Sequence, residues 1–284
     1  MKWSNIKELL MHILFFLTAC VSIFAVVLIC VFLFANGIPA IGKIGVFKFL
    51  LGTKWKPGND IYGILPMILG SLYVTAGAII IGVPIGLLTA VFLAKFCPKG
   101  LYKILKPATE LMAGVPSVVY GFFGLVVLVP LVQNIFGVAG NTMLTASVLL
   151  GIMILPTIIG VSESAIRAVP DSYYEGSLAL GASHERSVFF ASLPAAKSGI
   201  LAAIILGVGR AIGETMAVIL VAGNQTVIPK SITSGIRTLT SNIVMEMGYA
   251  GGLHREALIA TGVVLFVFIL IINLCFSALK RRKD

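Results

Sequence analysis

The chain has 284 residues, of which 58% are hydrophobic and only 11% are charged, and its mean hydropathy is +1.06. Soluble domains carry about 25% charged residues, so this composition excludes a water-soluble protein and indicates an integral membrane protein. The formal net charge of +10 could suggest nucleic-acid binding, but cationic loops beside apolar spans fit anionic lipid headgroups better.

Six apolar stretches are long enough to cross a bilayer, which takes about 20 helical residues. In chain order they are residues 12–35, 64–94, 109–135, 142–164, 198–222 and 257–279. The first exceeds the roughly 7–15 apolar residues of a secretory signal, so we expect a retained anchor. The sequence predicts an all-α, polytopic membrane protein with one transmembrane domain over residues 1–284.

Prolines and glycines interrupt several of these spans, among them Pro84, Pro116, Pro130 and Pro156. Proline frees a backbone carbonyl and bends a helix, whereas glycine lets neighbouring helices approach closely. Ordinary packing of a membrane bundle explains most of these residues. The alternative is that bent helices line a pathway that opens to one side and then the other.

The loops predict the orientation of the chain, because lysine and arginine favour the cytoplasmic face. With both termini in the cytoplasm, the basic residues of the inner loops outnumber those of the outer loops, although the first outer loop, residues 36–63, carries four lysines. Residues 223–256 form the second long outer loop. The bias places the polar loop at residues 169–194 in the cytoplasm.

That polar loop reads VPDSYYEGSLALGASHERSVFFASLP, and its local signals predict two short helices. Ser172 and Glu175 have the spacing of a capping box, so the first helix should begin near Tyr173. Gly181 suits the left-handed residue that ends such a helix, and Ser183 can cap the second.

Pro194 should close that second helix near Leu193. Neither helix is long enough to cross a bilayer. We therefore expect the pair to present apolar side chains to a partner protein, namely Leu178, Ala179, Val188 and Phe189.

The fifth span contains two charges, Arg210 and Glu214, one helical turn apart and on one face of a continuous helix. Arg210 lies roughly 18 Å into the span, where an arginine costs about 2.5–3.5 kcal/mol to insert. One interpretation is a structural ion pair. The other is a charged point in a polar pathway, in which the paired donors of arginine favour an oxyanion and Glu214 compensates Arg210 when no anion is bound.

The polar loop resembles the EAA loop of ABC importer permeases. It has an acid at Glu175, a glycine six residues later at Gly181, and the pair Leu193-Pro194 twelve residues after that. Alanines that often follow the acid are replaced by Gly176 and Ser177. In that family this segment, which we call the coupling loop (residues 169–194), docks in a cleft of a cytoplasmic ATPase.

Three further strings, at residues 113–125, 150–156 and 210–216, resemble the phosphate-specific (Pst) importer permeases. The Glu-Thr-Met continuation at residues 214–216 is more similar to the C-type subunit than to its A-type partner. The resemblance implies a type I ABC importer permease-like bundle in the bacterial inner membrane. It also implies four partners: a second, A-type permease subunit, a dimeric cytoplasmic ATPase, an external phosphate-binding protein, and phosphate itself.

We expect two sets of functional residues. The substrate pathway would include Arg210, Glu214 and Thr215, and the contact with the ATPase would use Glu175, Leu178, Ala179, Gly181, Leu193 and Pro194. The sequence has no G-x-x-x-x-G-K-[ST] stretch, so ATP and Mg²⁺ are expected on the partner ATPase, with no cofactor and no enzymatic activity in this chain.

Two alternatives remain open from the sequence, and a third, a membrane enzyme, is not supported. A permease for another oxyanion, sulfate or molybdate, would differ only in substrate. A secondary anion transporter would explain Arg210 and Glu214, but it would leave the coupling loop unexplained and predicts two homologous halves, which we do not find. A membrane enzyme needs a nucleophile, an acid–base pair or a metal set; the polar residues are too dispersed for one, so we assign no catalytic or metal-binding residue.

Overall fold

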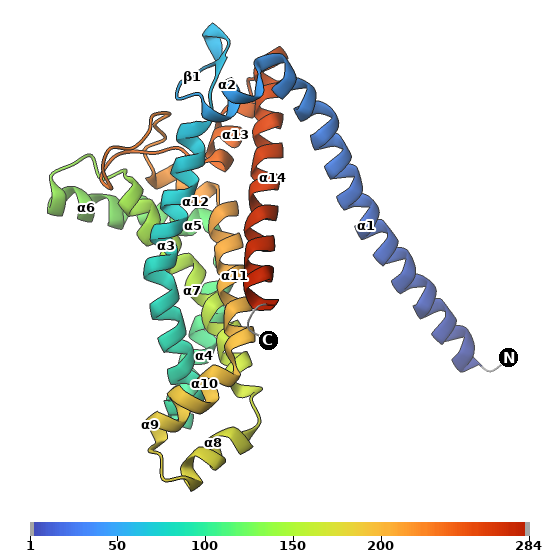
Figure 1. The fold of residues 1–284 in the computed structure, drawn as a ribbon, viewed down its shortest axis with the longest axis vertical. Coiled ribbons are helices and arrows are strands. Elements are labelled where there is room, and N and C mark those ends of the chain that lie inside the picture. Colours follow the sequence, from blue (N-terminus) through green and yellow to red (C-terminus); the bar gives the residue numbers. More distant parts are fainter. Residues whose placement is uncertain (1–2, 282–284) are drawn as a thin grey trace.

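The computed structural model describes residues 3–281, most of them helical (Figure 1). In chain order the elements are α1 (Trp3–Ile44), α2 (Val46–Leu51), β1 (Trp55–Lys56), the 3₁₀ turn η1 (Pro57–Asn59), β2 (Ile61–Tyr62), α3 (Leu65–Val91), η2 (Phe92–Phe96), α4 (Lys99–Gly114), α5 (Ser117–Phe123), η3 (Gly124–Leu128), α6 (Val129–Phe136), α7 (Met143–Arg167), α8 (Asp171–Ala179), α9 (His184–Ser187), η4 (Val188–Ser192), α10 (Leu193–Ala195), α11 (Lys197–Gly213), α12 (Met216–Val221), α13 (Leu239–Met247) and α14 (Gly252–Arg281). Three of these, η2, η3 and η4, are single π-helical turns. Residues 1–2 and 282–284, which belong to the predicted cytoplasmic termini, lie outside the described residues.

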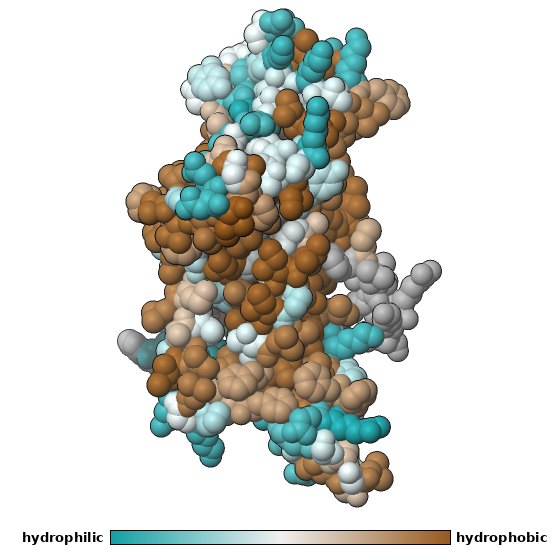
Figure 2. All heavy atoms as spheres, turned by 90° about the vertical axis from the view of Figure 1, so that its left-hand side faces the viewer, coloured by the Kyte–Doolittle hydropathy of each residue, from teal (hydrophilic) through white to brown (hydrophobic). Residues whose placement is uncertain are grey.

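Five helical segments of the described chain are long and apolar enough to cross a membrane: Lys7–Ile44, Leu65–Phe96, Ser117–Phe136, Met143–Arg167 and Gly252–Cys275. A sixth candidate is α11 together with the segment His184–Ala195, from which it is bent by 71°. The all-α, polytopic fold is therefore confirmed. Figure 2 shows the corresponding surface, with a mostly hydrophobic belt between two ends that carry more hydrophilic residues.

The third span differs from the prediction, because it begins at Ser117 and not at residue 109. Helix α4 continues through Pro107 to Gly114 and stops where Val115 takes an extended conformation (φ −69°, ψ 126°). A residue that precedes proline is disfavoured in the helical region, so Pro116 separates α4 from α5. None of the residues in α4 is buried, and it is an attached surface helix rather than part of the span.

The fifth span is broken, which the sequence analysis did not predict. Helix α11 stops at Gly213, Glu214 is extended (φ −67°, ψ 134°), and α12 begins at Met216. With 17 residues, α11 covers about 26 Å at 1.5 Å per residue. The short helix α12 continues the path after the break.

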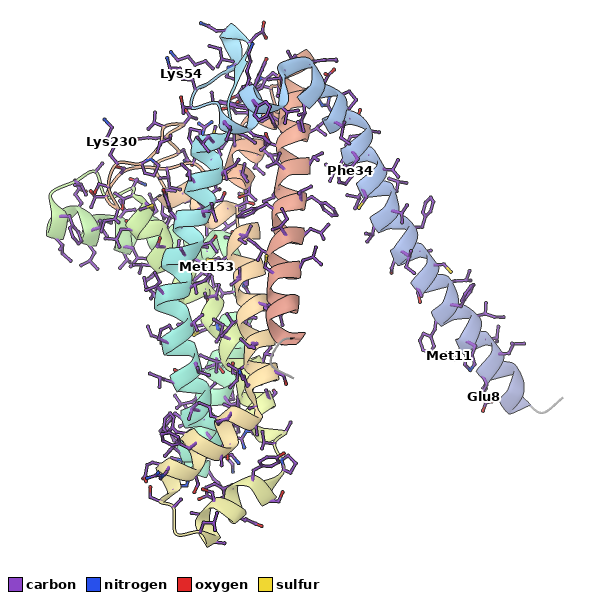
Figure 3. All side chains as sticks on the ribbon, viewed as in Figure 1. Glu8, Met11, Phe34, Lys54, Met153 and Lys230 are labelled. Atoms are coloured by element: carbon purple, nitrogen blue, oxygen red, sulfur yellow. The ribbon has the colours of Figure 1, made fainter. Side chains whose placement is uncertain are left out.

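Helix α7 is the centre of the bundle. Its buried side chains pack with α3, α11 and α12 in one apolar cluster that includes Val74, Met153, Ala211 and Val218, and Figure 3 places Met153 in the middle of the molecule. At Gly82 of α3 a Cβ atom would lie 2.8 Å from the carbonyl oxygen of Gly151. The two backbones are therefore too close for any larger residue there.

Helix α1 leaves the bundle at a steep angle (Figure 1). It meets α14 near its C-terminal end, where the rings of Phe34 and Phe266 pack edge to face with centroids 5.7 Å apart. Figure 3 shows Glu8 and Met11 at the opposite end of α1, away from all other helices. The first residues of α1 and the last residues of α14 both lie toward the end of the molecule that carries α8 and α9.

The two ends of the molecule carry different structures. The hairpin end has α2, α13 and the antiparallel pair β1–β2, with Trp55 opposite Tyr62. The loop end has α8, α9 and α10. At the hairpin end these elements replace the plain loops that the sequence predicts at residues 36–63 and 223–256.

Candidate functional site

Arg210 lies on α11, one turn before the helix ends, and its side chain is half-buried between helices. Its Nη1 atom donates a hydrogen bond to Oγ1 of Thr157 on α7 at 3.4 Å. Thr157 follows Pro156, and a proline cannot donate to the carbonyl four residues earlier, here that of Ile152. Arg210 therefore faces a stretch of α7 with a hydroxyl group and a carbonyl freed from the helical hydrogen-bond pattern.

The expected pairing of Arg210 with Glu214 is wrong. None of the ion pairs among the residues that the structure describes includes either side chain. The reason is the end of α11 at Gly213, since residues four apart share a face only on a continuous helix. Glu214 Oε1 instead accepts hydrogen bonds from the backbone N–H groups of Thr215 (3.1 Å) and Ala217 (3.2 Å).

Glu214 thus caps the first turn of α12, where N–H groups lack helical partners. The break is also tied to the hairpin end, because Thr240 Oγ1 of α13 donates to the Glu214 carbonyl oxygen at 3.0 Å. Thr215, the third predicted pathway residue, donates from Oγ1 to the carbonyl oxygen of Gly213 at 3.2 Å. Arg210, Glu214 and Thr215 therefore surround one helix break, and among the described residues Arg210 is the one of the three whose side chain donates a hydrogen bond to α7.

The coupling loop has the predicted helix–glycine–helix form with different boundaries. Helix α8 begins at Asp171 rather than near Tyr173, directly after Pro170, and Ser172 makes no capping hydrogen bond. Gly181 is in the left-handed region with φ +83°, and Ser183 Oγ accepts from the N–H of Arg186 at 3.3 Å. These two predictions are confirmed.

The second half of the coupling loop does not end at Leu193. Pro194 lies in the first turn of α10, where proline is tolerated because that N–H needs no partner, and the helix continues to Ala195. The chain then bends by 71° into α11. Leu193 is partly buried and packs against an apolar cluster that includes Ile166, Val188 and Ile200.

The apolar surface of the coupling loop is also composed differently from the prediction. Leu178, Ala179 and Phe189 are exposed as expected, and so are Leu180 (90%) and Phe190 (78%). Val188 is fully buried, so the prediction that it is presented to a partner protein is wrong. It packs with residues of the loop ends of α3, α7 and α11, a cluster of Ala90, Val91, Ile166, Val169, Ala196 and Ile200.

Polar and aromatic contacts hold the coupling loop to the end of α3. Tyr174 Oη and His184 Nδ1 are 2.7 Å apart, which joins α8 to α9. The His184 ring packs edge to face on Phe96 of η2 at 4.7 Å, and Lys95 lies 3.8 Å from Asp171. The loop therefore stands on the ends of α3 and α7 as one unit.

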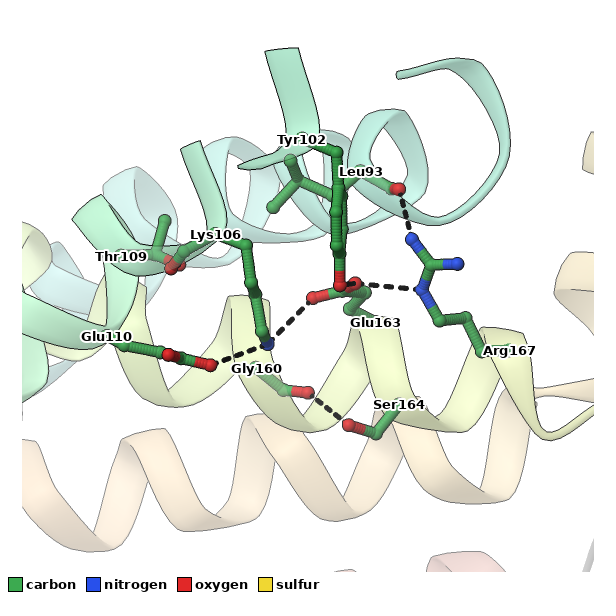
Figure 4. A network of polar contacts seen from close by, with 9 residues as sticks. All are labelled: Leu93, Tyr102, Lys106, Thr109, Glu110, Gly160, Glu163, Ser164 and Arg167. Atoms are coloured by element: carbon green, nitrogen blue, oxygen red, sulfur yellow. Dashed lines mark hydrogen bonds and ion pairs between the residues drawn. The ribbon is translucent and has the colours of Figure 1, made fainter. Parts of the chain in front are cut away.

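A buried carboxylate lies one helical turn from this unit (Figure 4). The Glu163 side chain on α7 is only 2% exposed. Its Oε1 accepts from Tyr102 Oη and from Arg167 Nε, both at 2.8 Å, and its Oε2 accepts from Lys106 Nζ at 2.9 Å. Arg167 Nη2 donates to the carbonyl oxygen of Leu93 at 2.7 Å. We call Glu163, Tyr102, Lys106 and Arg167 the Glu163 cluster.

The contacts of the Glu163 cluster favour the protonated forms of its two residues from α4, Tyr102 and Lys106. Burial, the largest influence, lowers the pKa of Lys106, but its hydrogen bond and charge contact with Glu163 outweigh burial and leave that pKa above its ordinary value. The hydrogen bond to Glu163 raises the pKa of the Tyr102 phenol. Sequence reasoning missed this cluster, although an acid inside the apolar run at residues 142–164 was a usable signal.

A second buried carboxylate organises the hairpin end. Glu246 of α13 accepts from Trp55 Nε1 at 2.9 Å and from Arg237 Nη1 at 2.6 Å, and it lies 2.8 Å from His254 Nε2. These contacts join β1, α13 and the start of α14. Since α13 also contacts the backbone of Glu214, the hairpin end is connected to the break in the fifth span.

Solved structures share this helical arrangement. A bacterial ABC transporter that imports the acidic polysaccharide alginate has a chain with a TM-score of 0.64 and 16% identity, covering 99% of both chains. A chain of the inward-facing MetNI methionine ABC transporter gives 0.63 and 20%, covering 81% of this chain and 99% of its own. The fold is therefore that of the membrane-spanning permease subunits of ABC transporters.

The chain belongs to the family described as binding-protein-dependent transport system inner membrane component, whose model matches residues 82–284. The probable ABC transporter permease protein YqgH of Bacillus subtilis is 38% identical, covering 94% of this chain and 89% of its own length. The phosphate transport system permease protein PstC of Haemophilus influenzae is 36% identical (78% and 76%), and the probable PstC of Methanocaldococcus jannaschii is 32% identical (100% and 99%). The resemblance to Pst permeases found in the sequence is confirmed.

Proposed function

We propose that this chain is the permease subunit of an ATP-driven importer for inorganic phosphate and that Arg210 binds the anion in the pathway. The observation that carries the proposal is the Arg210 guanidinium, which contacts a single hydroxyl, that of Thr157, and no carboxylate among the described residues. A guanidinium has five N–H donors in a fixed fork, so most of its donors are available to an oxyanion. The relatives named as phosphate transport permeases support phosphate over sulfate or molybdate.

The hydrogen bonds of Glu214 change the role that we propose for it, because it does not compensate the charge of Arg210. With Glu214 bound to the backbone of α12, the positive charge of Arg210 is not neutralised by its neighbour. A cation that is uncompensated within a span is costly, and an entering anion offsets that cost. Thr215 then stabilises the backbone of the helix break beside Arg210. The hydroxyl group of Thr157 is an additional hydrogen-bond donor or acceptor for the anion.

The exposed apolar residues of the coupling loop support an ATPase partner. Leu178 lies on α8, Leu180 in the turn that follows it and Phe190 on η4, all exposed, and such anchors fit a preformed groove on a partner. ATP and Mg²⁺ belong to that partner, a cytoplasmic dimer, because this sequence has no phosphate-binding loop. Glu175, Ala179 and Gly181 complete the docking element, and Leu193 and Pro194 join it to α11.

The remaining partners follow from the two ends of the molecule. A phosphate-binding protein docks on the hairpin end, outside the cell membrane, and a second, A-type permease completes the pathway. Both termini and the coupling loop are cytoplasmic in this arrangement. Closure of the ATPase dimer moves the coupling loop, the spans rearrange around Arg210, and phosphate passes from the hairpin end to the loop end.

Uptake of radiolabelled phosphate, normalised to the amount of protein in the membrane, tests the role of Arg210. We expect Arg210→Gln to insert normally and to lose at least about tenfold in uptake, since a charged hydrogen-bond donor contributes about 1.5–3 kcal/mol. Arg210→Lys keeps the charge without the planar fork and should retain weak uptake. Lys7→Gln, which removes an exposed positive charge near the start of α1, is the control and should transport normally.

Wild-type uptake in Arg210→Gln would overturn the anion-site proposal. Competition with unlabelled sulfate and molybdate tests the substrate separately. If either blocks phosphate uptake by the wild-type protein as strongly as phosphate itself, the alternative of a general oxyanion permease replaces phosphate specificity.

A further inference from the structure

We propose that Glu163 is a positioning residue for transport: it fastens α4 to the end of α7, so that α4 moves together with the coupling loop. Through α4, this motion reaches the start of the third span and then the helix break beside Arg210. The inference rests on the proposed function and adds to it the route inside this chain between the ATPase contact and the anion site.

The first step of this route is the position of the Glu163 cluster. Arg167 is the last residue of α7, and three residues later Pro170 leads into α8. Arg167 also binds the carbonyl oxygen of Leu93 in η2, and Lys95 in the same π-helical turn contacts Asp171 of α8. A movement of α8 therefore acts through η2 on Arg167, which holds Glu163; Figure 4 shows the contacts of Arg167 with Leu93 and Glu163.

The second step is the attachment of α4. Since α4 buries none of its own residues, its apolar packing is weak, and Tyr102 and Lys106 supply its strongest contacts with α7. The Arg167 guanidinium also lies over the Tyr102 ring at 4.7 Å. Removal of the central carboxylate would leave two cations, the partly exposed Lys106 and Arg167, beside each other without their shared anion, and their repulsion would loosen α4 from α7.

The third step runs from α4 to the helix break. Tyr120 of α5 donates from Oη to the carbonyl oxygen of Met112 at 2.9 Å, across the Pro116 bend. Helix α5 packs closely on α12, because a Cβ atom on Gly121 would lie 2.9 Å from Cα of Ala217. Ala217 is one of the two residues whose N–H groups bind Glu214, so α4, α5 and α12 form a continuous path to the break.

A purely apolar contact could hold α4 to α7 equally well, since replacing a buried ion pair by packed apolar residues is often neutral or stabilising. The ionic cluster adds a single fixed register between the two helices, because each oxygen of Glu163 has a defined donor. A fixed register is what the transmission of a small helix movement requires.

The test measures phosphate uptake and ATP hydrolysis together, in proteoliposomes that contain the complete transporter and loaded binding protein. In Glu163→Gln we expect ATP hydrolysis to stay within about twofold of wild type and uptake per ATP to fall about tenfold. Tyr102→Phe removes one hydrogen bond and should show a smaller loss of the same kind. Glu110→Gln changes the exposed acid 3.6 Å from Lys106 and is the matched control, with an unchanged ratio.

A cross-link distinguishes positioning from stability. The double variant Tyr102→Cys, Glu163→Cys is made in a background without the four native cysteines, Cys20, Cys30, Cys97 and Cys275. While its two thiols are free, it should hydrolyse ATP with little phosphate uptake. A short bifunctional thiol reagent should restore uptake per ATP, because it ties α4 to α7 again. If Glu163→Gln fails to insert, Tyr102→Phe, which keeps the Glu163 carboxylate and its contacts with Lys106 and Arg167, still tests the inference through the ratio of uptake to ATP hydrolysis.

Two results would overturn the inference. One is a wild-type ratio of uptake to ATP hydrolysis in both Glu163→Gln and the free-thiol pair, which would make the cluster architectural. The other is a block of uptake by the cross-link, which would mean that α4 must separate from α7. Failure of the proposed function is recognised differently, by the absence of phosphate uptake in the wild-type transporter.

Discussion

The carboxylate of Glu214 serves the backbone of α12 and not the charge of Arg210. Its two hydrogen bonds, to the N–H groups of Thr215 and Ala217, need an oxygen acceptor at this position but no net charge. Arg210 needs a charge and a fork of donors. The two residues that look equivalent in the sequence therefore make opposite predictions under substitution.

We expect Glu214→Gln to keep the cap and most of the uptake, because the amide oxygen of glutamine can accept the same hydrogen bonds. Glu214→Ala should lower the thermal stability of the purified protein, since loss of a helix cap costs about 1 kcal/mol. Thermal unfolding in detergent and uptake in cells are the measurements. Equal damage in both variants would show that the charge of Glu214 matters and would bring back the ion-pair interpretation.

At the scale of elements, the coupling loop depends on one backbone conformation. Gly181 has φ +83°, and a Cβ atom at this position would meet no heavy atom within 4 Å. The cost of a side chain is therefore conformational, about 1–2 kcal/mol for an ordinary residue in the left-handed region, and higher for a β-branched one.

Gly181→Val should shift α9 relative to α8 and reduce both uptake and the amount of ATPase that copurifies with the permease. Gly181→Asn is the matched control, because asparagine tolerates the left-handed region, and it should behave almost as wild type. A valine variant with full uptake would mean that the turn between α8 and α9 need not be rigid.

At the scale of the whole molecule, the hairpin end and the loop end are expected on opposite sides of the membrane. In a background without native cysteines, an impermeant thiol reagent applied to intact cells should label a cysteine introduced by Asn59→Cys and miss one introduced by Ser183→Cys. After permeabilisation, both should react. Labelling of the Ser183→Cys variant in intact cells would contradict the orientation and, with it, docking of a cytoplasmic ATPase on the coupling loop.

How much of this molecule was predictable depended on the range of the interactions involved. The existence of the spans and the turn at Gly181 follow from apolar length and from local chemistry, and they were predicted, although the third span begins later than expected. The break after Gly213 was not, since no proline marks it and the contacts that hold it open come from Ala217 and the distant Thr240. Val188 was placed on the surface because Ala90 and Ile166, which bury it, are far away in the sequence.

The three π-helical turns have a consequence for the length of the chain. A π-helical turn closes with an i→i+5 hydrogen bond and so contains one residue more than the α-helical turn it replaces. Deletion of exposed Val126 from η3 (Gly124–Leu128) should convert that turn to α-helix and leave α5 and α6 in their present rotational relation. Deletion of Ile152 from the uninterrupted α7 should instead rotate every later residue of the helix by about 100° and remove Glu163 from its partners. Membrane levels should therefore survive the first deletion and collapse with the second, so this chain can lose a residue in the third span that it cannot lose in the fourth.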